Sequence, residues 1–99
     1  MIDVKITDYG SKKPNDNYIK YTVSGLTLEA IDYLDKNLED KHTISGDNLI
    51  ITMNFPDKYY PFGSDVAKFR LEDFIAREEI EMMVFLSSFL EDMVNQVND

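Results

Sequence analysis

The fold is decided by the C-terminal stretch, residues 72–99, which reads EDFIAREEIEMMVFLSSFLEDMVNQVND. This stretch contains neither glycine nor proline, the two residues that most disfavour a helix interior. Its acids crowd toward the start, and its middle is apolar. We therefore predict one long C-terminal helix with an acidic first half, and we expect the rest of the chain to fold against it.

One side of this predicted helix is apolar along its length. At 100° per residue, eight apolar side chains fall within one arc about 100° wide. They are Leu71, Ile75, Met82, Leu86, Phe89, Leu90, Met93 and Val97. We expect this arc to be the face that packs on a small sheet.

Two apolar residues, Ile80 and Val84, lie on the opposite side of the same helix. Together with Phe85 they make the helix apolar on nearly all sides between residues 80 and 86. A helix of this kind is usually buried by more than one layer, so ordinary core packing favours a cover from the N-terminal hairpin loop or the first helix. The alternative is that Ile80, Val84 and Phe85 form a contact with a second copy or another partner.

The acids of the helix do not form a row. Glu79 falls inside the apolar arc, where it either reaches water at the sheet edge or is a functional carboxylate with a raised pKa. The others, Glu72, Asp73, Glu78 and Glu81, spread around the helix. To imitate a nucleic-acid phosphate track, the segment would have to combine with acids of the first helix, Glu29, Asp32, Glu39 and Asp40. A solvated charged face is the simpler interpretation.

Upstream, alternation of apolar and polar residues predicts strands at 2–7, 18–23, 42–44 and 49–55, and we expect residues 8–17 to be a loop. Thr27 is a good N-cap for a helix whose buried face carries Leu28, Ile31, Leu34 and Leu38. Residues 66–71 are ambiguous, and we favour a short fifth strand over helix there. The sequence thus predicts an α+β fold in one domain, residues 1–99. It has a small, mainly antiparallel sheet in the order strand–strand–helix–strand–strand, one short helix, and the long C-terminal helix packed on one face.

Composition excludes several classes of function. The net charge of −9, of which residues 72–99 carry −7, disfavours direct binding to nucleic acid or an anionic membrane. The absence of cysteine and of a signal-peptide pattern at the start fits a cytoplasmic protein. His42 is the only histidine, and no phosphate loop, nucleophile motif or calcium loop is present. We therefore expect no metal, no cofactor and no catalysis.

What remains is protein binding. We expect a basic protein partner, contacted by Tyr59, Tyr60 and Phe62 of a proline-bounded loop and by the helix acids Glu72, Asp73, Glu78, Glu79 and Glu81. The loop aromatics could instead fold back to cover the end of the core. Other hypotheses are an accessory subunit that self-associates through Ile80, Val84 and Phe85, and an enzyme that uses Glu79.

In charge, size and lack of catalytic groups, the chain is similar in kind to small acidic inhibitors such as anti-CRISPR proteins and nuclease immunity proteins. This similarity is one of composition. It implies inhibition of a basic, nucleic-acid-handling protein.

Overall fold

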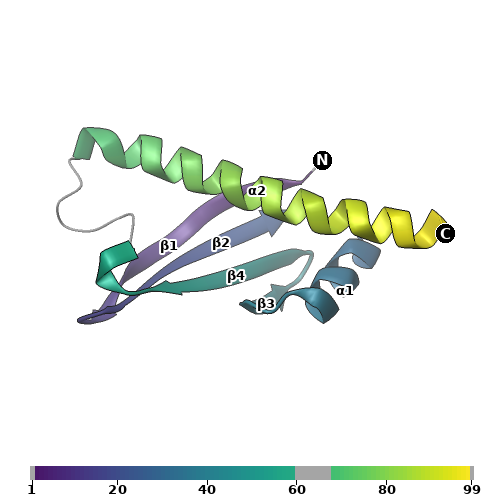
Figure 1. The fold of residues 1–99 in the computed structure, drawn as a ribbon, viewed down its shortest axis with the longest axis horizontal. Coiled ribbons are helices and arrows are strands. Elements are labelled where there is room, and N and C mark those ends of the chain that lie inside the picture. The colour runs from purple at the N-terminus through teal and green to yellow at the C-terminus, as the bar shows by residue number, and fades with distance from the viewer. Residues whose placement is uncertain (1, 60–67, 99) are drawn as a thin grey trace.

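The computed structural model describes residues 2–59 and 68–98 and shows an α+β fold (Figure 1). Four antiparallel strands form one sheet in the spatial order β1-β2-β4-β3. The strands are β1 (Asp3–Lys13), β2 (Asp16–Ser24), β3 (Lys41–Ser45) and β4 (Asn48–Phe55). Helix α1 (Leu28–Asn37) connects β2 to β3, the 3-10 turn η1 (Asp57–Tyr59) follows β4, and the long helix α2 spans Lys68–Asn98.

The first two strands are longer than the sequence pattern predicts. Residues 8–17 are not a loop: β1 and β2 stay paired almost to their tip, where only Pro14 and Asn15 form the turn. Two register shifts, between Ile6 and Asp8 and between Ser11 and Lys13, interrupt the pairing. Each shift moves the following side chains to the other face, which explains why the alternation fades after residue 7.

The hairpin tip is fixed to the end of β4. The amide of the buried Asn17 donates to the carbonyl oxygen of Phe55 (3.1 Å) and to Oδ1 of Asp57 (2.8 Å). The backbone N–H of Asp57 in turn donates to Oδ1 of Asn15 (2.8 Å). These bonds satisfy a polar side chain that would be costly to bury unpaired.

Helix α1 begins as predicted, because Oγ1 of Thr27 accepts a hydrogen bond from the backbone N–H of Ala30 (3.1 Å). Ile31 and Leu34 are buried, but the assignment of Leu28 to the buried face is wrong, since this side chain is 78% exposed. At 100° per residue Leu28 lies roughly 110° from the centre of the arc defined by Ala30, Ile31 and Leu34.

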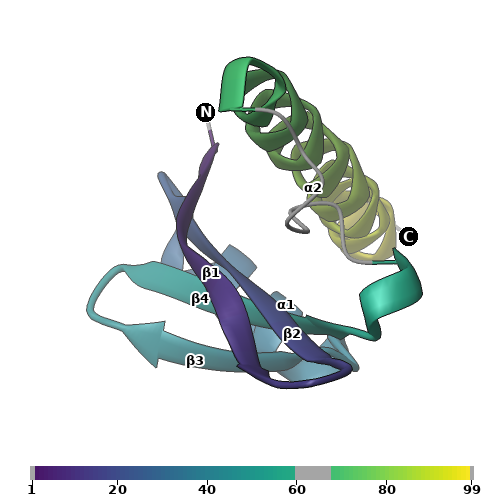
Figure 2. The same cartoon turned by 90° about the vertical axis from the view of Figure 1, so that its left-hand side faces the viewer.

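The core lies between α2 and the concave face of the sheet (Figure 2). Alternate residues of β2 and β4 supply its floor, and α2 contributes Met82 and Leu86, as the predicted apolar arc requires. Ile75, Phe89, Leu90 and Met93 of the same arc are half-buried. The long helix packed on one face of the sheet is therefore confirmed.

The expected strand at 66–71 is wrong for residues 68–71, which form the first turn of α2; Val66 and Ala67 lie outside the described residues. Extending an existing helix adds one hydrogen bond for each residue fixed, and this outweighs a short alternating pattern.

Candidate functional site

Glu79 is directed toward the sheet edge. Its Oε2 accepts a hydrogen bond of 2.8 Å from the backbone N–H of Ile6, beside the first register shift of β1. Because β1 is an edge strand, this carboxylate covers a backbone donor that the sheet leaves unpaired. Glu79 is half-buried and bound within the molecule, so its position inside the apolar arc has a structural explanation.

Glu78 and Glu81 lie on another side of α2, where they line a cavity of about 430 Å³ between the helix and the sheet. We call it the acid-lined cavity. Its walls are Tyr21, Asp40, Met53, Phe55, Glu78, Glu81, Met82 and Phe85. Three carboxylates thus line the cavity together with aromatic and methionine side chains, and the described lining includes no lysine or arginine. The volume falls within the range of roughly 300–1,000 Å³ that is common for ligand pockets.

The electrostatics of the cavity are unfavourable to its own charges. Burial, and then the negative charge of Glu81, raises the pKa of the Glu78 carboxyl, while Arg77 and a hydrogen bond with Tyr21 act in the opposite direction. Tyr21 is 2% exposed, and burial, followed by the charges of Glu78 and Glu81, raises the pKa of its hydroxyl. A positively charged group entering here would relieve this repulsion.

Carboxylate, aromatic and methionine side chains together are able to bind an organic cation. Within the described part of the chain, no three carboxylates or imidazoles converge closely enough to hold a metal ion. Aromatic faces attract ammonium and guanidinium groups, and methionine side chains accommodate their aliphatic stems. The cavity therefore suits a lysine or arginine side chain.

His42 helps to place one wall of this cavity. Its Nδ1 lies 2.7 Å from the backbone oxygen of Asp40, and its Nε2 lies 2.9 Å from Oδ1 of Asp35 in α1. The bond with Asp40, assisted by Asp35, raises the pKa of the imidazole. The only histidine thus joins β3 to α1 and holds the segment that carries Asp40.

The opposite side of α2 is not covered. Ile80 is 60% exposed and Val84 is 61% exposed, so the expected cover from the N-terminal hairpin loop or α1 is wrong. Both elements lie on the sheet side of α2 (Figure 2). Phe85 is different: it is 41% exposed, lines the acid-lined cavity, and stacks edge-to-face on Phe89 with ring centroids 5.0 Å apart.

The remaining predicted contacts are scattered. Glu72 and Asp73 are exposed near the start of α2. Tyr59 ends η1, but its side chain, like Tyr60 and Phe62, lies outside the described residues. Helix α1 lies beneath the C-terminal half of α2, away from residues 72–81 (Figure 1). The acids of the two helices therefore form no continuous row, and of the α1-side acids only Asp40 lines the cavity.

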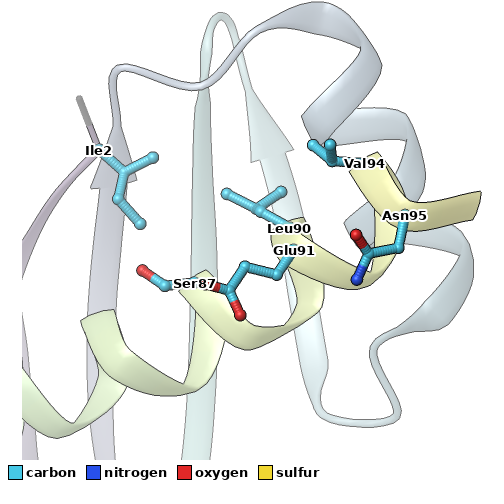
Figure 3. Close-up of a pocket in the computed structure, with 6 residues that line it drawn as sticks. All are labelled: Ile2, Ser87, Leu90, Glu91, Val94 and Asn95. Carbon is cyan, nitrogen blue, oxygen red and sulfur yellow. The ribbon is translucent and has the colours of Figure 1, made fainter. Parts of the chain in front are cut away.

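A second hollow, of about 440 Å³, lies along the C-terminal half of α2 (Figure 3). Its apolar part comes from Ile2, Leu90 and Val94, and its polar part from Ser87, Glu91 and Asn95. The described lining of this hollow includes one acid, whereas that of the acid-lined cavity includes three. The second hollow should therefore attract a cation less strongly.

Sequence reasoning missed most of the cavity walls. The sequence predicted Met82 in the core, assigned Tyr21 only to the strand at 18–23, and gave Asp40 no role of its own in a site. The available signal was Tyr21, since a tyrosine at a core position needs a partner for its hydroxyl.

The fold and the site together define a small acidic α+β protein with a carboxylate-lined cavity under its long helix. Residues 3–92 match the family described as "Family of unknown function (DUF5750)", and the chain belongs to this family. The match spans the four strands, α1 and α2 as far as Asp92, and so includes all the described residues that line the acid-lined cavity. No curated protein shows significant similarity to the chain. No helix among the described residues is long and apolar enough to cross a membrane.

Proposed function

We propose that this protein is a non-catalytic binder of a basic protein partner, and that a lysine or arginine side chain of the partner enters the acid-lined cavity. The observation that supports the proposal most directly is the lining itself. Asp40, Glu78 and Glu81 line the cavity together with three aromatic side chains, and the described lining supplies no base to neutralise them.

The rest of the charge distribution supports the same partner. A net charge of −9 speeds the encounter with a basic surface, and exposed acids such as Glu72 and Asp73 extend that attraction along α2. Long-range electrostatic attraction raises the association rate and orients the approaching partner. A side chain held in a desolvated pocket contributes most of the binding affinity. The cavity and the charged helix therefore have complementary roles.

Proteins that handle nucleic acid are the partner class with the most strongly basic surfaces. Occupying such a surface blocks it, so we propose inhibition of a cytoplasmic, nucleic-acid-handling protein. The loop aromatics Tyr59, Tyr60 and Phe62 belong to this proposal as further contacts, whereas Glu79 holds α2 on β1.

The test is affinity capture from a lysate with matched variants. Glu78→Gln/Glu81→Gln removes two charges from the cavity, and the control Glu29→Gln/Glu39→Gln removes two exposed charges beside the sheet. We expect the wild type and the control to retain basic proteins at about 50 mM salt and to release them toward about 500 mM. We expect the cavity variant to retain none of these proteins.

Two results contradict the proposal. The first is that no basic protein is captured, or that capture is indifferent to salt. The second is equal loss of binding in both double variants, which would mean that net charge acts alone and the cavity plays no part.

A second candidate function is that of an accessory subunit that self-associates. The exposure of Ile80 and Val84 on the outer side of α2 favours it.

A further inference from the structure

The side of α2 that faces away from the sheet carries a defined set of exposed residues. At 100° per residue they fall within an arc about 80° wide, opposite the buried Met82 and Leu86. We call this set the outer ridge. Among the side chains that the structure describes, it consists of Asp73, Arg77, Ile80, Val84, Ser88, Glu91 and Asn95.

The outer ridge is apolar at its centre and charged toward its ends. Among the described side chains, Ile80 and Val84 are the most exposed large apolar ones after Leu28. Next to them the hydroxyl of Ser88 donates to the backbone oxygen of Val84 (3.3 Å), so the polar atom of Ser88 is already engaged within the helix. Arg77 lies one turn before this centre, and Glu91 lies two turns after Val84.

We propose that the outer ridge docks on the outer ridge of a second copy of this chain, with the two α2 helices antiparallel and Val84 on the two-fold axis. In this register each residue lies level with the one equally far from Val84 on the other helix. Arg77 then meets Glu91, Asp73 meets Asn95, Ile80 meets Ser88, and Val84 meets Val84. Two-fold symmetry produces the Arg77–Glu91 pair twice.

Charge complementarity selects this register. In a parallel pair every acid of the ridge would lie level with its own copy, as would Arg77. An antiparallel pair shifted to match Ile80 with Val84 would place Asp73 level with Glu91, and would leave Arg77 level with Ser87. The arrangement centred on Val84 avoids both repulsions, and in it the only base of residues 72–99 meets an acid.

The groups that would pair are available. Within the described part of the chain neither Arg77 nor Glu91 belongs to an ion pair. The guanidinium of Arg77 is 4.8 Å from the centre of the Phe74 ring, which orients it at the surface of the helix. Glu91 stands at the rim of the second hollow, beside Ser87 and Asn95 (Figure 3).

The dimer is expected to be weak and to respond to salt in a particular way. A contact along one helix with two apolar residues at its centre is small compared with a stable interface of roughly 1,600 Å². Two chains of charge −9 repel each other, so added salt should favour the dimer. Binding of a basic partner should respond to salt in the opposite direction, so the two proposals can fail separately.

Cysteine cross-linking tests the register, because the chain has no cysteine of its own. Under mild oxidation we expect Val84→Cys to form disulfide-linked dimers at least about tenfold faster than Thr43→Cys, an exposed control on β3, since only close Cβ atoms can be bridged. We expect Ile80→Cys mixed with Ser88→Cys to give the mixed dimer, and either variant alone to cross-link at the rate of the control. Cross-linking of Ile80→Cys alone at the rate of Val84→Cys would contradict the register centred on Val84 and overturn the proposal.

Sedimentation of charge-exchange variants provides a second test. Arg77→Glu or Glu91→Arg alone creates like-charge contacts, and each should raise the dissociation constant about fivefold or more. The double variant Arg77→Glu/Glu91→Arg should return it to the wild-type value. A strict monomer at high concentration in both low and high salt, or a double variant as weak as the single ones, would overturn the proposal. Val84→Glu should abolish the dimer and leave capture of a basic partner unchanged.

Discussion

Two adjacent acids of α2, Glu78 and Glu79, have different surroundings and therefore different roles. Glu78 and Glu79 differ by one step of about 100° on the helix. That step places Glu79 against the backbone of β1 and Glu78 in the wall of the acid-lined cavity. A helical projection of the sequence identified Glu79 as the unusual residue and gave Glu78 no separate role. The environments of Glu78 and Glu79 differ because different parts of the sheet face the two sides of α2. A helical projection of the sequence contains no information about the sheet.

Glu78 should make stability depend on pH. Its pKa is raised above the ordinary value of 4.5, mainly by burial, so folding disfavours the charged form. The penalty is absent at acid pH, where Glu78 is protonated in both states, and it develops as the pH rises from 4.5 through the raised pKa. Glu78→Gln removes the penalty and keeps an oxygen that can accept from Tyr21. We therefore expect this variant to melt at a higher temperature than the wild type at pH 7, and at an equal temperature below pH 4.

Thermal unfolding followed by circular dichroism over this pH range measures the effect. Glu72→Gln, at an exposed position, serves as the control and should follow the wild type throughout. The opposite result is that Glu78→Gln melts further and further below the wild type as the pH rises. This result would show that folding stabilises the charged form of Glu78 and would contradict the prediction.

At the scale of elements, the sequence predicted most of the fold. Alternation located β2 and β4, whose buried residues include Ile19, Tyr21 and Leu49, and helical spacing located Met82 and Leu86. The errors occur where tertiary contacts override local signals. Residues 8–17 were expected to be a loop, but β1 and β2 pair through most of this segment. Gly10 therefore lies within β1, and Pro14 lies in the hairpin turn, which Asn17 joins to the end of β4. Similarly, nothing local showed that residues 68–71 would join α2.

The contact between Glu79 and Ile6 joins two elements far apart in sequence, α2 and the edge strand β1. Replacing Glu79 by Ala leaves the Ile6 N–H without its acceptor and should lower the free energy of unfolding by about 1–3 kcal/mol. Glu79→Gln should cost less, because its amide oxygen can still accept the bond. Urea unfolding measures the loss, and hydrogen exchange should show faster exchange of the Ile6 amide in Glu79→Ala.

The control is Glu72→Ala, which changes an exposed acid of the same helix and should stay within about 0.5 kcal/mol of the wild type. If Glu79→Ala proved no less stable than this control, with the exchange rate of Ile6 unchanged, the bond would contribute nothing to holding α2 on β1.

At the scale of the whole molecule, α2 runs along a body of 48 × 25 × 24 Å and presents two exposed sides of different chemistry. One side opens on the acid-lined cavity, and the other is the outer ridge. Composition predicted the acidic character and the basic partner that we propose. It could not predict the cavity, because Asp40, Tyr21 and Glu78 come together only when β2, the segment before β3 and α2 are packed.

The most direct test of the central claim, that the acid-lined cavity accepts a cationic side chain, is a titration followed by the NMR signals of ¹³C-labelled methionine methyl groups. Met53 and Met82 line the cavity, whereas Met93 lies against a different hollow beside Leu90 and serves as an internal reference. When a lysine-rich peptide is added at low salt, we expect the Met53 and Met82 signals to shift and saturate while the Met93 signal stays in place. The shifts should disappear in Glu78→Gln/Glu81→Gln. Unchanged Met53 and Met82 signals, or equal shifts at Met93, would contradict the account.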